Sequence, residues 1–179
     1  TLKCILRRDP IFAPKLNLNY FAWSKMRKDG IPEGNWPPRS VHITNYYHEF
    51  SGGVKSNYDK LLKAADRHRR RVTLIVPGDH DHFAQIGEYG KIYYIKARPA
   101  PMFDRRYRMI LPDQYVPGDS AMRKILLEEM PQIVEIYDNY SLTLLAGIIR
   151  KGRFKELGRP MFVYFTGERF DTIIKSFVA

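Results

Sequence analysis

The stretch from Val41 to Gly78 decides the fold: VHITN at 41–45, YYHEFSGGV at 46–54, an amphipathic run, and RVTLIVPG at 71–78. The two apolar runs predict strands at 40–45 and 71–76, and the run between them predicts a helix at 53–68. In that run, apolar side chains recur at helical spacing while charged ones fill the other side. The apolar side chains are Val54, Tyr58, Leu61, Leu62 and Ala65. Strand, glycine loop, helix and strand together predict a βαβ unit.

A pair of glycines, Gly52 and Gly53, stands where this helix begins, behind Ser51 as a candidate cap. Such a loop brings backbone N–H groups and a helix N-terminus together, and both attract an anion. The alternative is that the glycines only join strand to helix, because paired glycines are common in turns. The spacing matches neither the dinucleotide-binding fingerprint nor a phosphate loop that ends in Lys-Ser/Thr.

The remainder of the chain divides at about residue 38. Residues 1–38 are rich in Pro, Gly and scattered aromatics, and we read them as an extension that packs on the domain or pairs with a neighbouring chain as a homodimer. Residues 39–179 alternate strands and helices, which predicts an α/β fold: a three-layer, Rossmann-like, open and mainly parallel sheet with helices on both faces. Further strands are predicted at 91–96, 132–137 and 160–165, helices at 118–129, 140–151 and 168–176, and a loop at 97–117 with a short extended piece around 107–111.

Composition narrows the class of protein. The chain has 179 residues and one cysteine, so an intrachain disulfide is excluded and a reducing compartment is expected. No apolar run approaches the roughly 20 residues that cross a bilayer. We therefore expect a cytoplasmic protein, with peripheral contact to the inner membrane face as a further hypothesis.

The net charge is +11, with basic clusters at 67–71, 105–108 and 150–155. The charge favours an anionic partner, such as a nucleotide-sugar, an anionic lipid surface or a nucleic acid. The alternative is that the clusters are solvated helix ends, where cations oppose the negative end of the helix dipole.

In an open α/β sheet the ligand binds outside the carboxyl ends of the strands. Tyr47 and His48 follow the first strand, Asp138 follows the fourth, and Glu168 and Arg169 follow the fifth. Asp138 is also a natural helix cap, and Glu168 suits the first turn of a helix. After the second strand, the run Gly78-Asp79-His80-Asp81-His82 contains metal-ligating residue types, but neighbouring side chains alternate in direction. We therefore predict a polar loop there and no metal site.

Several of these segments together resemble glycosyltransferase family 4, over about residues 39–172. The resemblance rests on Phe50-Ser51-Gly52-Gly53-Val54, on Leu61-Leu62 with Ala64, on Arg71 to Gly78, on Ala100-Pro101 and Tyr107-Arg108, on Pro131 to Asp138, and on Arg159 to Phe165 with Glu168-Arg169-Phe170-Asp171. The order and spacing are most similar to those of mannosyltransferase-type and related lipid-sugar members.

The resemblance implies half of a GT-B fold, in which two Rossmann-like domains face a cleft. The implied activity is transfer of a hexose from a nucleotide-sugar, with retention of configuration and without a metal or other cofactor, to a lipid, glycan or small acceptor. Gly52 and Gly53 would place backbone amides against the donor diphosphate, and Tyr47, His48, Asp138, Glu168 and Arg169 would border the acceptor or sugar. A histidine that family members often carry after the fifth strand corresponds here to Gly167.

The resemblance also implies that this chain is the acceptor-side domain, with the donor-binding C-terminal domain outside it, so the 179 residues alone are expected to be inactive. The other interpretation is a basic Rossmann-like module without catalytic activity that binds an anionic partner or self-associates. Nucleic acid is the less favoured partner, because the basic residues are dispersed and no RNA-binding signature or helix-turn-helix is present.

Overall fold

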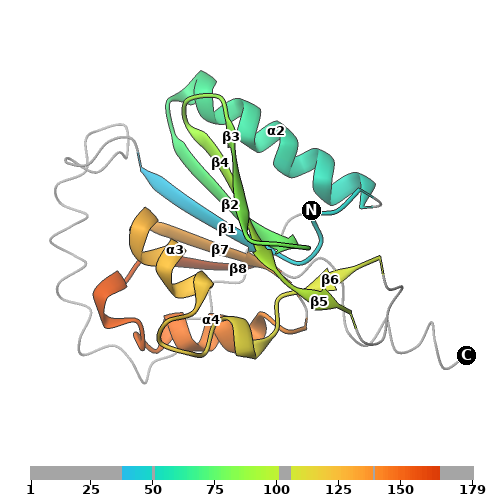
Figure 1. The fold of residues 1–179 in the computed structure, drawn as a ribbon. Helices are drawn as coiled ribbons and strands as arrows, with labels where there is room; N and C mark the ends of the chain where they lie inside the picture. The colour runs from blue at the N-terminus through green and yellow to red at the C-terminus, as the bar shows by residue number, and fades with distance from the viewer. Residues whose placement is uncertain (1–37, 50, 101–105, 139, 166–179) are drawn as a thin grey trace, which may run out of the picture. The chain divides into compact units, whose positions relative to one another are not determined.

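The computed structural model describes residues 38–49, 51–100, 106–138 and 140–165 (Figure 1). All of them belong to one of the two compact units of the chain, residues 37–179. The extension 1–38 except Pro38, the predicted helix at 168–176, and the candidate residues Glu168 and Arg169 lie outside the described residues.

The centre of the described unit is a six-stranded sheet in the order β3-β4-β2-β1-β7-β8. Five strands are parallel and confirm the five that the sequence predicts. They are β1 (Arg39–Thr44), β2 (Arg71–Gly78), β4 (Gly90–Lys96), β7 (Ile133–Tyr137) and β8 (Met161–Phe165). The buried pattern of β2, with five consecutive buried residues from Val72 to Val76, is typical of a parallel strand covered on both faces.

The edge strand β3 (His82–Ile86) pairs antiparallel with β4 and was not predicted. Its sequence mixes polar and apolar residues without a clear period, so nothing local marks it as a strand. The turn that returns it to β4 contains Gly87 with φ +68°, and the carboxylate of Asp66 accepts hydrogen bonds from the N–H groups of Glu88 and Tyr89. A residue on the distant helix therefore shapes the turn that makes this strand.

Helices cover both faces of the sheet, which confirms the predicted three layers (Figure 1). The helix α2 (Gly52–His68) packs on one face through Tyr58, Leu62 and Ala65. The helices α3 (Ala121–Glu129) and α4 (Thr143–Arg150) pack on the other, around buried residues such as Leu126 and Leu145. The remaining elements are β5 (Arg98–Pro99), β6 (Arg108–Met109) and the 3₁₀ turns η2 (Pro112–Gln114) and η3 (Lys155–Leu157).

Of the two helix starts predicted on the second face, one is confirmed as a cap. Ser120 caps α3, with its Oγ accepting from the N–H of Arg123. The second predicted start, Asp138, is not the cap of α4: it accepts from the N–H groups of Tyr140 and Leu142 in the preceding turn, and the N-cap residue Leu142 makes no side-chain capping hydrogen bond. In β6, the two residues paired with β5 confirm the short extended piece predicted around 107–111.

Two of the basic clusters lie where helices end. Helix α2 has Arg67 and His68 in its last turn and is followed by the C-cap residue Arg69, whose backbone is left-handed with φ 49°. Helix α4 ends at Arg150. Cations in these positions oppose the negative end of the helix dipole. Of the helices in the described ranges, none combines the length and the hydrophobicity needed to cross a membrane.

A polar contact ties α2 to the middle of the sheet. Nδ1 of His42 on β1 lies 3.1 Å from Oε1 of Glu135 on β7, and the hydroxyl of Tyr58 on α2 donates to the same oxygen at 3.3 Å. The hydrogen bond from His42 is the largest influence that holds the pKa of Glu135 below its ordinary value. Stability from this carboxylate is therefore present above pH ~4.3, the unfolded pKa, and is lost as the pH falls through the lower folded pKa.

We expect Glu135→Gln to remove part of this acid sensitivity. The free energy of unfolding should fall by about 1 kcal/mol at neutral pH, where the charged hydrogen bond is lost. The gap between variant and wild type should narrow as the pH falls below about 4.3, because the wild-type carboxylate becomes protonated as the pH passes through its lowered folded pKa. Urea unfolding at each pH measures this, with Glu88→Gln at an exposed position as the matched control. A gap that is constant with pH would contradict the assignment.

Candidate functional site at the carboxyl edge of the sheet

The strand order reverses between β1 and β7. From β1 the chain continues through α2 to β2 on one side, and β7 takes its place on the other side only after β4 and α3. In open α/β sheets, ligands bind outside the carboxyl ends of the strands at such a switch point. The residues that follow β1 and β7 are therefore the first place to look for a binding site.

A buried polar cluster lies beneath this edge of the sheet. It consists of Asn45, Asp138, Ser141 and the backbone of Ile110. The side-chain amide of Asn45 donates to Oδ1 of Asp138 at 3.1 Å and to Oγ of Ser141 at 2.9 Å, and its oxygen accepts from the N–H of Ile110 at 2.9 Å. Ser141 in turn donates to the carbonyl of Ile110 at 2.7 Å. Three loops are thereby joined below the surface.

Asp138 is fully buried at the centre of this cluster. Its second oxygen accepts from the N–H of Tyr140 at 2.8 Å and from that of Leu142 at 2.9 Å. Burial raises the pKa of Asp138, and these hydrogen bonds oppose the rise. Asp138 does not cap α4, whose N-cap residue is Leu142; its hydrogen bonds hold the turn that leads into the helix. Because Asp138 is buried, it supports the site and does not line its surface.

Tyr47 is buried, as Asp138 is. Its side chain is buried against α2, and its hydroxyl donates to Oδ1 of Asp59 at 2.7 Å. Burial is the main cause that raises the pKa of this hydroxyl above its ordinary value, with the Asp59 carboxylate adding to it. Lys55 lies with its Nζ 5.1 Å from the ring centre of Tyr47 and 2.8 Å from Oδ2 of Asp59. Tyr47 thus anchors the first turns of α2.

His48 lies in the loop between Tyr47 and the start of α2. Its N–H donates to Oγ of Ser51, and Ser51 Oγ donates to the carbonyl of His48 at 3.0 Å. The imidazole meets the ring of Tyr107 edge-on, with ring centres 4.3 Å apart. Partial burial lowers the pKa of His48, which favours a neutral ring at physiological pH. His48 and Tyr107 come from loops far apart in sequence, and the fold brings them together.

The first turn of α2 is open. Ser51 stands at the N-cap position but its side chain makes no capping hydrogen bond, because it is engaged with His48. Within the part of the chain that the structure describes, no atom lies within 4 Å of a Cβ built on Gly52 or on Gly53, and both glycines are exposed. The predicted cap is therefore not made by Ser51, and the helix N-terminus presents bare backbone.

An aromatic row, which the sequence analysis did not foresee, lies along the same edge. The rings of Tyr46 and Tyr137 are 5.3 Å apart, and those of Tyr137 and Phe165 are 5.0 Å apart in an edge-on contact. Tyr137 and Phe165 are the last residues of β7 and β8, and Tyr46 lies two residues beyond the end of β1. Aromatic residues at or just beyond the ends of adjacent parallel strands are the signal that would have predicted this row, because such positions share one edge.

Metal-ligating side chains gather at one place among the described residues. Asp79, His80 and His82, beyond the end of β2, each offer one ligand atom, and these atoms lie within 4.8 Å of one another. The predicted polar loop brings these three side chains to one side of a turn.

Comparison with known proteins gives no further guide: no family model, no curated protein and no solved structure matches this chain.

Proposed function

We propose that this chain is the acceptor-side domain of a retaining glycosyltransferase that transfers a hexose from a nucleotide-sugar to a lipid, glycan or small acceptor. The observation that carries the proposal is the bare glycine pair at the N-terminus of α2, placed at the carboxyl edge of a Rossmann-like sheet. The resemblance of residues 39–172 to glycosyltransferase family 4 supports it.

The fold itself does not require glycine at these two positions. Neither Gly52 nor Gly53 has a positive φ, and neither is in close contact with another element. A helix position occupied by glycine is less stable by about 1 kcal/mol than one occupied by alanine. The two glycines therefore lower the stability of the helix at positions where a side chain would have open space around it. A ligand that approaches the backbone closely is a physical reason for that choice.

An anion fits this position. The first N–H groups of a helix have no partner within the helix, and the 17 residues of α2 align their peptide dipoles behind them. A diphosphate held there would be stabilised as negative charge builds on it during departure from the sugar. Lys55 is engaged by Asp59, so the backbone rather than this lysine would supply the nearest positive potential.

The acceptor side of the proposal uses the neighbouring surface. Neutral His48 beside Tyr107 and the aromatic row of Tyr46, Tyr137 and Phe165 offer an edge that combines apolar faces with hydrogen-bonding groups, as a sugar requires. Tyr47 and Asp138 are buried beneath this surface and hold the loops that form it. Glu168 and Arg169 remain proposed acceptor or sugar contacts.

The proposal is tested by nuclear magnetic resonance on the ¹⁵N-labelled chain, titrated with UDP-glucose and with GDP-mannose. We expect saturable shifts of the amide signals of Gly52 and Gly53 and of the loop at 46–49, with inorganic diphosphate as a competitor. An absence of shifts at these amides at millimolar donor would overturn the assignment of the diphosphate site.

The chemistry is tested on the product of the complete open reading frame, by release of nucleoside diphosphate and by the anomeric configuration of the product. Transfer with inversion, or hydrolysis of the donor without any acceptor product, would contradict the proposed reaction. The second candidate function, an anion-binding module, predicts instead that single-stranded oligonucleotides shift the signals of 67–71 and lose affinity steeply with salt.

A further inference from the structure

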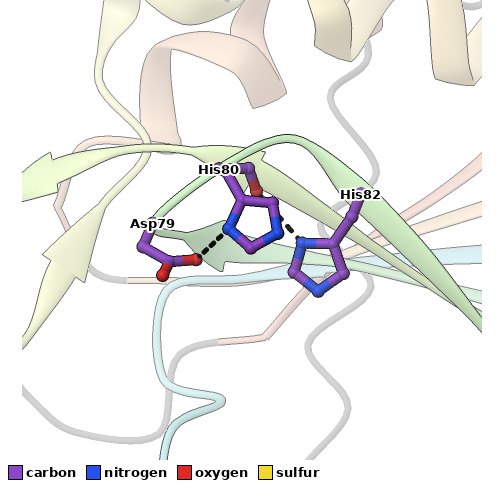
Figure 2. Close-up of side chains that lie close together, drawn as sticks. All are labelled: Asp79, His80 and His82. Carbon is purple, nitrogen blue, oxygen red and sulfur yellow. Dashed lines mark hydrogen bonds and ion pairs between the residues drawn. The ribbon is translucent and has the colours of Figure 1, made fainter.

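We propose that Asp79, His80 and His82 form a binding site for a transition-metal cation of the zinc class. The two imidazoles act as ligands, and Asp79 orients His80 and adds negative charge. Figure 2 shows the three side chains gathered on one side of the turn between β2 and β3. This site and the proposed diphosphate site stand on different residues, so either can fail without the other.

The hydrogen bonds leave the same nitrogen available on both rings. Nδ1 of His80 lies 2.7 Å from Oδ1 of Asp79, and Nδ1 of His82 lies 3.2 Å from the carbonyl oxygen of His80. A carboxylate and a carbonyl oxygen only accept, so Nδ1 carries the proton in both rings. In a neutral imidazole the lone pair is then at Nε2, where a metal binds. A histidine ligand whose other nitrogen donates to a carboxylate or a backbone carbonyl is the usual arrangement around a protein-bound metal.

Contacts with β4 hold the turn between β2 and β3 in place. The ring of His82 stacks on that of Tyr94 at 4.2 Å with planes only 6° apart, and the rings of His80 and His82 stack at 4.4 Å. Gly78 allows the close approach, because a Cβ there would lie 2.9 Å from Cβ of Tyr94. The next carboxylate, Asp81, accepts from the N–H of Lys96 at 2.6 Å. The histidines are therefore placed by the sheet, and their outer sides are exposed.

The donor set selects the cation. Imidazole suits zinc, copper and nickel, whereas magnesium and calcium take oxygen ligands. Zinc–nitrogen bonds of about 2.0–2.1 Å put neighbouring ligand atoms roughly 3.3 Å apart in a tetrahedron. One possible ligand atom from each of Asp79, His80 and His82 lies within 4.8 Å of the others. Rotation of the exposed histidine side chains would bring both Nε2 atoms onto one cation, with water in the remaining positions.

Isothermal titration of the full chain with ZnCl₂ in a non-chelating buffer tests the site, with the affinity tag removed and Cys4→Ser throughout so that the thiol takes no part. We expect one equivalent of zinc to bind, and His80→Ala and His82→Ala each to weaken binding at least tenfold, a loss of the size that removal of an orienting partner already produces. Mg²⁺ in excess should not compete. Asp79→Asn should weaken binding less than either alanine variant.

His68→Ala is the matched control, because His68 is an exposed histidine at the end of α2, outside the turn. It should bind zinc as the parent does. Imidazole ¹⁵N signals provide the second readout, since only those of His80 and His82 should move. Undiminished binding in both His80→Ala and His82→Ala, or a loss that follows His68 instead, would overturn the proposal.

Discussion

Asn45→Ala is expected to lower the free energy of unfolding by about 3 kcal/mol, the largest effect of a single substitution in this site. The change removes three hydrogen bonds at once: two that the amide donates, to Asp138 and Ser141, and one that it accepts from Ile110. It leaves the N–H of Ile110 without this partner in the core, and it takes a donor from a buried carboxylate. Unsatisfied buried groups cost about 1–3 kcal/mol each.

The loss should depend on pH in a defined direction. Burial already raises the pKa of Asp138, so removing one of its donors raises that pKa further. A raised folded pKa means that the native state favours the protonated form, so stability recovers as the pH falls through that folded value. The deficit of Asn45→Ala relative to wild type should therefore be smaller near pH 5 than at pH 7.

Urea unfolding followed by circular dichroism at the two pH values measures both effects. Asn57→Ala, at an exposed position on α2, is the matched control and should change stability by no more than about 0.5 kcal/mol. A deficit below about 1 kcal/mol for Asn45→Ala would show that the buried cluster does not hold the three loops.

Gly53→Asp is the second substitution with a large expected effect, and it should separate stability from binding. An aspartate in the first turn of α2 meets no steric obstacle, because a Cβ there has open space. It replaces a poor helix former and places a negative charge at the positive end of the helix dipole, which should stabilise the fold by about 1 kcal/mol.

The same carboxylate would repel a diphosphate at the helix N-terminus. A carboxylate in the first turn of α2 would make diphosphate binding less favourable by about 2 kcal/mol or more in a partly solvated site. The dissociation constant would then rise roughly thirtyfold. The variant should therefore melt at a higher temperature than wild type and bind UDP-glucose, GDP-mannose or inorganic diphosphate far more weakly. Thermal melts and the amide titration give the two readouts on the same sample.

Gly118→Asp is the matched control for this variant. Gly118 is exposed, has no positive φ and also has open space at its Cβ, and it precedes the cap of α3 rather than starting α2. It changes the net charge equally, so it corrects for the general effect of charge on anion binding. Equal loss of donor binding in Gly53→Asp and Gly118→Asp would refute a diphosphate site at α2.

Much of the fold could be predicted from the sequence, and the reason is local. The apolar runs of the five parallel strands and the helical spacing of Tyr58, Leu62 and Ala65 express the two periods of secondary structure directly. The glycine pair and the capping residue Ser120 mark where α2 and α3 begin. Each of these signals involves residues within about one turn or one strand of each other.

The candidate site was only partly predictable. Gly52, Gly53 and His48 were placed at the correct edge, because the carboxyl ends of parallel strands share it. The burial of Tyr47 and Asp138 depends on Asp59 and Asn45, and the hydrogen bond that fixes Asp138 joins residues 93 positions apart. No local pattern carries such a pairing.

The sequence by itself determined the alternation of strands and helices, the mainly parallel three-layer sheet and the place of the glycine pair at the start of α2, because these follow from periodicity and from the positions of the glycines. Only the tertiary structure decided which polar residues support the site from below, that an aromatic row borders it, that β3 closes the sheet against β4, and that Asp79, His80 and His82 share one side of a turn. The physical reason is that hydrogen bonds and ring contacts act over a few ångströms between residues that the chain itself keeps far apart.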